Sequence, residues 1–148
     1  MKKEISFRFS TGTATLCVFD LECLKHRLND DADWWSMPEE ELIEVNAGNV
    51  AFIGLNDDGG YTVLVVDEMP IFDAEFSIKV PSGKIFIGAG EEVTSAGLEP
   101  EGLLGVFRQL PIGNYSLRVR RSEVDREVEI AVTPGTVGKN NFSTPVKI

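Results

Sequence analysis

A single histidine, His26, limits the catalytic chemistry available to this chain of 148 residues. A serine triad would have to use it, yet no serine lies in a G-x-S-x-G turn. Cys17, Cys23 and His26 carry zinc-binding groups, but their C-x5-C-x2-H spacing lacks the second cysteine pair of a structural zinc site. We therefore expect two small core cysteines and a surface histidine, and we predict no catalytic residue, no metal and no cofactor.

Two groups of acidic residues raise the alternative of a hydrolase built on carboxylates or on a hard cation. One group is Asp30, Asp31 and Asp33, and the other is Asp57 and Asp58 within the run 56–60. Calcium loops alternate their ligands and end in a distant glutamate, a pattern that 56–60 lacks. Asp, Asn and Gly are common turn residues, so we predict a turn there. These patterns together favour a protein that is not an enzyme, and a hydrolase that uses acidic residues or a metal ion is the alternative.

Trp34 and Trp35 are the only tryptophans in the chain. Neighbouring side chains of an extended segment point to opposite sides, so we expect at most one of them to be fully buried. The pair either clamps a helical segment onto a sheet or anchors a binding surface, because tryptophan is enriched at the centres of interfaces. A sandwich that binds a sugar or another small ligand on a Trp platform is a further alternative.

The acidic residues are concentrated in one part of the chain. The formal net charge is −10, from 24 acids and 14 bases. Residues 20–68 hold 13 of the acids but only Lys25 and Arg27, a net charge of −11, whereas all other residues together carry +1. This balance excludes nucleic acid and anionic membranes as partners, because both are bound through clustered cations. We predict instead that residues 20–68 form an acidic face for a basic protein partner, with the candidate binding residues Trp34, Trp35, Asp30, Asp31, Asp33, Glu39, Glu40, Glu41 and Glu44.

The elements that must position these residues are mostly strands. Apolar residues alternate with polar ones in the stretches 5–10, 14–18, 76–80, 116–120 and 128–132, which is typical of half-buried strands. The runs 50–55 and 61–67, joined by the turn at 56–60, are predicted to pair as a hairpin. We predict a mainly β fold, an antiparallel β-sandwich or barrel-like single domain over residues 1–148, with a short helical insert around residues 21–46.

Two helices are expected in this insert. The first begins after Asp20, a suitable N-cap, and the second begins near Ser36 with Pro38 in its first turn. Leu42 and Ile43 are expected to face inward, and the run 46–48 is expected to end the helix at its glycine. Near the other end of the chain, residues 138–143 are predicted to form a loose tail.

Residues 110–119, Leu-Pro-Ile-Gly-Asn-Tyr-Ser-Leu-Arg-Val, are similar to the LPxGxYxLxV turn and strand of many β-sandwich modules. The whole chain also resembles small acidic bacterial proteins, some of which are immunity proteins of toxin systems. The resemblance implies a non-catalytic bacterial protein of the immunity type and assigns no site residue; the face of residues 20–68 follows from the charge distribution alone. The N-terminal residues lack the apolar stretch of a signal peptide, which favours a cytoplasmic location.

Overall fold

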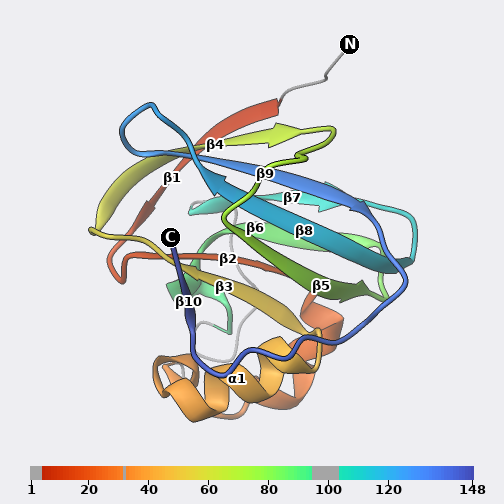
Figure 1. Ribbon diagram of the computed structural model, residues 1–148. Coiled ribbons are helices and arrows are strands. Elements are labelled where there is room, and N and C mark those ends of the chain that lie inside the picture. The colour runs from red at the N-terminus through yellow and green to blue at the C-terminus, as the bar shows by residue number, and fades with distance from the viewer. Residues whose placement is uncertain (1–4, 32, 95–103) are drawn as a thin grey trace.

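Two β-sheets of five strands each pack face to face in the computed structural model (Figure 1), which describes residues 5–31, 33–94 and 104–148. The first sheet has the order β1 (Ile5–Thr11), β4 (Gly59–Val66), β9 (Glu127–Pro134), β8 (Gly113–Arg121) and β5 (Ala74–Val80). The second has the order β10 (Val146–Lys147), β3 (Val50–Gly54), β2 (Thr15–Phe19), β6 (Lys84–Ala89) and β7 (Gly105–Gln109). The prediction of a mainly β sandwich with a short helical insert is confirmed, although β4–β9 and β3–β10 pair in parallel.

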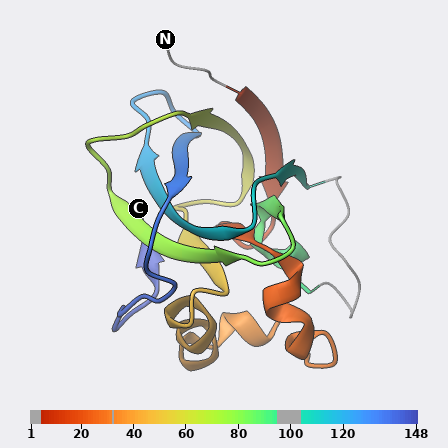
Figure 2. The ribbon, with the colours of Figure 1, turned by 90° about the vertical axis from the view of Figure 1, so that its right-hand side faces the viewer.

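The helical insert forms a third layer on the outer side of the second sheet (Figure 2). It comprises the 3-10 helices η1 (Leu21–Arg27) and η2 (Trp34–Ser36) and the helix α1 (Pro38–Asn46), and a further short turn, η3 (Gly90–Glu92), follows β6. Because both faces of the second sheet are covered, four consecutive residues of β2, 16–19, are buried. No helix in the described ranges is long and apolar enough to cross a membrane.

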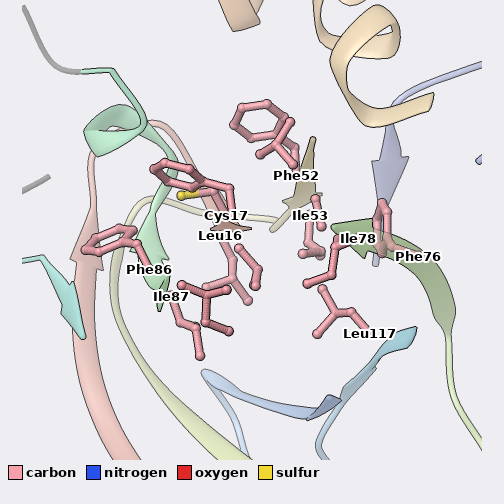
Figure 3. Packing of buried hydrophobic residues seen from close by; sticks show 14 of the residues in the cluster. Leu16, Cys17, Phe52, Ile53, Phe76, Ile78, Phe86, Ile87 and Leu117 are labelled. Carbon is pink, nitrogen blue, oxygen red and sulfur yellow. The ribbon is translucent and has the colours of Figure 1, made fainter. Parts of the chain in front are cut away.

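The core between the sheets is continuous with the core under the insert. In Figure 3, Leu16 and Ile53 of the second sheet lie near Ile78 and Leu117 of the first, whereas Phe52 points to the helical side. This division follows from the period of two along a strand, which turns neighbouring side chains to opposite faces. The second sheet therefore supports the insert through a layer of its own apolar side chains.

The predicted hairpin of residues 50–55 and 61–67 is wrong. β3 pairs with β2 and β10 of the second sheet, and β4 pairs with β1 and β9 of the first. The reason lies in their burial: residues 50–53 of β3 are all buried, whereas β4 alternates from Tyr61 to Val65. A strand such as β3, which is buried on both faces, must lie in a sheet that is covered on both sides, and this is the second sheet. The loop after β3 then carries the chain to the first sheet, where β4 lies.

The segment 138–143, predicted as a loose tail, is tied to two elements. The Asn140 side chain accepts from Ser77 N at 2.6 Å and donates to Ser77 O at 2.9 Å and to Val45 O at 2.7 Å. The Phe142 backbone exchanges two hydrogen bonds with the Asn46 amide, at 2.8 and 3.0 Å. The C-terminal segment thus joins the end of α1 to the free edge of β5, which sequence periodicity could not indicate.

The turn and strand expected from the resemblance at residues 110–119 are present. The Tyr115 hydroxyl donates to Pro111 O at 2.6 Å, and β8 begins at Gly113. Tyr61 makes the same contact with Asp57 O, also at 2.6 Å, in the crossing loop. Each tyrosine therefore closes the turn four residues before it, as in the tyrosine corners of other sandwiches.

Candidate functional site

Arg27 is the centre around which the acidic residues of the insert are arranged. Its Nη1 lies 3.1 Å from Asp30 Oδ2 and 2.9 Å from Glu40 Oε1, and its Nε lies 2.8 Å from Glu44 Oε2. The guanidinium carbon also lies 4.5 Å from the centroid of the Trp34 ring. One arginine therefore connects the end of η1, the following turn, η2 and α1. The planar fork of five donors makes arginine suited to such a position.

Glu44 is the buried member of this network, although it was predicted as a binding residue. Its side chain is 4% exposed and accepts from Arg27, from His26 Nε2 at 2.9 Å and from Asn49 Nδ2 at 2.7 Å. Burial acts to raise the pKa of Glu44, but the hydrogen bonds from Asn49, His26 and Arg27 outweigh it and lower the pKa below its ordinary value. Glu44 thus holds the insert together from within and presents no free carboxylate to a partner.

A groove at the surface of the insert brings together several of the predicted residues. It is lined by Arg27, Asn29, Asp30, Asp31, Asp33, Trp34, Met37 and Glu40, and we call it the acidic groove. Asp31 and Asp33 are exposed, and their carboxylates have no hydrogen-bond or ion-pair partner in the described ranges. The Met37 side chain beside them is 57% exposed. The groove therefore combines unpaired negative charge with an accessible apolar side chain.

Both tryptophans are buried, so the expectation that at most one would be is wrong. The ring of Trp35 stacks on Phe52 at 5.4 Å, and that of Trp34 meets Phe52 edge-on at 6.2 Å. Residues 34–36 form a 3-10 turn, in which successive side chains are only about 120° apart, so both rings reach the same face. Trp34 Nε1 donates to Thr94 Oγ1 at 3.0 Å, whereas Trp35 Nε1 has no partner among the described residues. The pair clamps the insert onto the second sheet, and only Trp34 lines the acidic groove.

The remaining acids of the predicted face do not join the groove. Glu39 is exposed on α1, and Glu41 is partly buried, which raises its pKa to about 7. The predicted inward face of α1 is shifted, because Ile43 is 55% exposed whereas Val45 is buried. Asp57 and Asp58 lie in the loop between β3 and β4, which follows the end of β3 that is opposite to its connection with the insert. The charge of residues 20–68 is therefore divided between separate surfaces.

The two thiols lie apart from the groove. The Cys17 thiol donates to Ala89 O at 3.4 Å in the core, and burial raises its pKa. The Cys23 thiol donates to Lys79 O at 3.6 Å, and burial raises its pKa to about 11. Within residues 5–31, 33–94 and 104–148, no group of three or more His, Cys, Asp or Glu side chains is placed to hold a metal ion. The groove itself is suited to electrostatic and apolar contact with a cationic surface.

Sequence reasoning missed the role of Arg27. A signal was present, because residues 20–46 contain nine acids and Arg27 is the only arginine among them. A carboxylate that is buried needs an opposite charge beside it, and Arg27 is the arginine that this segment offers.

One family model matches the sequence of this chain, and two solved structures are similar to its fold. A family model described as "Family of unknown function (DUF6386)" matches residues 1–148. No curated protein matches the chain in sequence. The solved structure described as "Crocagin biosynthetic gene J" is 15% identical, with a TM-score of 0.57 over 90% of this chain and 97% of that chain. A second solved structure is that of ComJ from Bacillus subtilis, which is described as an inhibitor of the DNA degrading activity of NucA. It is 15% identical, with a TM-score of 0.51, and the match covers 91% of this chain and 99% of the ComJ chain. At this identity, both likenesses show a shared fold.

Proposed function

The chain belongs to the family of unknown function DUF6386, and we propose that it acts by binding, as an inhibitor of the immunity type that covers a basic surface of a partner protein with the acidic groove. The observation that carries this proposal is the pair of unpaired, exposed carboxylates of Asp31 and Asp33 beside the exposed Met37. Complementary charge accelerates association and selects the partner, and an apolar contact at its centre slows dissociation.

The likeness to ComJ supports the choice of partner class. ComJ is described as an inhibitor of the DNA degrading activity of NucA. Enzymes that act on DNA bind phosphates through clustered Lys and Arg, so they present the kind of surface that an acidic groove complements. We therefore propose a DNA-degrading enzyme, or another protein with a basic substrate cleft, as the partner.

The test begins with capture of the partner from the native host and continues with association kinetics on the purified pair. The double variant Asp31→Asn/Asp33→Asn removes two charges without changing the size of either side chain. We expect it to lower the association rate constant about 10-fold at low salt and to weaken the salt dependence of that constant. The variant Met37→Ser should chiefly raise the dissociation rate constant, because it removes apolar contact.

The matched control is Asp57→Asn/Asp58→Asn, which makes the same charge change in the loop between β3 and β4. Under the proposal, this control keeps nearly the wild-type association rate when the variants are compared at about 0.1 M salt, where screening limits the reach of a surface charge to about 10 Å. Equal slowing by both double variants would mean that only the net charge matters. Unchanged binding by Asp31→Asn/Asp33→Asn would reject the acidic groove as the interface.

A further inference from the structure

The outer face of the second sheet carries an aromatic row that the insert covers only in part. At one end of the row, Phe52 lies under both tryptophans. At the other end, the ring of Phe86 packs between Phe19 at 5.9 Å and Phe107 at 5.3 Å. Phe19 and Phe86 are buried, but Phe107 on β7 is 39% exposed. The aromatic layer is therefore left uncovered at Phe107 by the described residues.

A pocket of about 210 Å³ lies at this uncovered end, between η1 and the strands β6 and β7. Phe19, Phe86 and Phe107 form its aromatic wall, and Glu22, Lys25 and Lys84 are among the charged residues that line it. An engineered apolar cavity of about 150 Å³ binds benzene, so this pocket has room for one aromatic ring and a small substituent. Its lining combines the apolar side chains of Phe19, Leu21, Phe86 and Phe107 with polar and charged ones, and a concave aromatic surface with polar groups beside it is typical of small-molecule sites.

The charges around the pocket indicate the sign of the substituent. The Asp20 carboxylate accepts from Glu22 N at 3.0 Å and from the backbone and hydroxyl of Ser82 at 2.8 Å, so its oxygens are occupied. Glu22 is paired with Lys25 at 2.8 Å. Lys84 forms no ion pair with any described residue, and its Nζ lies 4.8 Å from the centroid of the Phe107 ring. Asp20 has no counter-ion among the described residues either, but its oxygens are satisfied by neutral donors, whereas the ammonium group of Lys84 contacts only the face of the Phe107 ring in the described ranges. Lys84 is therefore the charged group of the lining that is available to a ligand.

We propose that this pocket binds a small aromatic carboxylate. The ring packs against Phe107 and Phe86, and the carboxylate accepts a hydrogen bond from Lys84 Nζ, which leaves the face of Phe107 on binding. The ligand completes the aromatic layer where the insert ends, and it supplies the anion that Lys84 lacks. This site is separate from the acidic groove, and the proposal does not depend on the function proposed above.

Phenylacetate is a suitable probe, with benzyl alcohol and benzylamine as neutral and cationic analogues of similar size. Titration of the full chain, followed by two-dimensional NMR of the backbone amides, should show saturable shifts for phenylacetate centred on β6, β7 and η1. We expect dissociation constants of the order of 1 mM, as for other ligands of this size, so titration to about 10 mM is sufficient. Benzyl alcohol should bind about 5-fold more weakly, and benzylamine more weakly still, because Lys84 favours an anion.

Two variants locate the site, and a third is the matched control. Lys84→Gln should weaken phenylacetate about 5-fold and leave benzyl alcohol unchanged, because only the charge contact is lost. Phe107→Ala should weaken both, since the ring loses its packing surface. Lys139→Gln changes an exposed lysine that does not line the pocket and should have no effect. The absence of shifts at about 10 mM, tighter binding of benzylamine, or equal effects of the two lysine variants would overturn the proposal.

Discussion

The Arg27 Nε donates to Glu44 Oε2 at 2.8 Å, and the two side chains are only 11% and 4% exposed. A buried ion pair of this kind contributes little net stability when intact, but the loss of one partner leaves a buried charge uncompensated. The structure of the insert therefore depends on a contact between one residue at the end of η1 and one on α1.

The first prediction concerns this pair. Arg27→Met should lower the free energy of unfolding by about 3 kcal/mol, measured by urea denaturation, because Glu44 keeps only His26 and Asn49 as donors. The control Lys25→Met, on the same turn, breaks an exposed pair with Glu22 and should cost under about 1 kcal/mol. The double variant Arg27→Met/Glu44→Leu should recover much of the loss. Equal stability of Arg27→Met and wild type would show that the network is not structural.

The second prediction concerns Glu41, whose pKa burial raises to about 7 from its ordinary value of 4.5. Between these pH values the folded protein binds more protons at this site than the unfolded chain, so Glu41 lowers stability as the pH rises through that range. Glu41→Gln should therefore stabilise the protein by about 1 kcal/mol at pH 8 and by almost nothing at pH 4, after allowance for solvent screening.

Thermal unfolding across this pH range measures the effect. Glu39→Gln, an exposed change on the same turn of α1, is the matched control for the lost charge. The quantity of interest is the difference between the two variants in the slope of stability with pH. Identical slopes would contradict a carboxyl group at Glu41 that is protonated near neutral pH.

The third prediction concerns the C-terminal segment. Asn140→Ala removes three side-chain hydrogen bonds, to Val45 and to both backbone groups of Ser77. We expect a loss of about 1–3 kcal/mol in the free energy of unfolding and faster hydrogen exchange at Ser77 N. Asn141→Ala, next in the chain and exposed, should change stability by less than about 0.5 kcal/mol. If the two variants behaved alike, the segment would be the loose tail that its sequence indicated.

The fourth prediction compares two tyrosines with the same turn contact. Tyr115→Phe and Tyr61→Phe each remove one hydroxyl that donates to a backbone carbonyl at 2.6 Å. Each should cost about 1 kcal/mol, and the double variant should show the sum, because the two turns share no contact through these hydroxyls. Urea midpoints measure both effects. If either variant were as stable as the wild type, the hydroxyl that it lacks would not contribute to the stability of the fold.

Much of the secondary structure could be predicted because its signals are local. Asp20 accepts a hydrogen bond from Glu22 N at the start of η1, as expected of an N-cap, and α1 begins at Pro38. Gly48, with φ of +77°, follows its end. Alternation along β4, β5 and β8 shows the faces that are buried. Each of these features depends on a few neighbouring residues and on backbone sterics alone.

The sequence by itself determined that this is a mainly β chain with a short helical insert and that its excess negative charge lies in residues 20–68. Only the tertiary structure decided which sheets β3 and β4 join, because the alternation of apolar and polar residues along a strand identifies its buried face but not the strand with which it pairs. It also decided which acids are free: Arg27 and Glu44 meet from different elements, whereas Asp31 and Asp33 remain exposed. Pairing between distant side chains depends on packing, which local patterns do not encode.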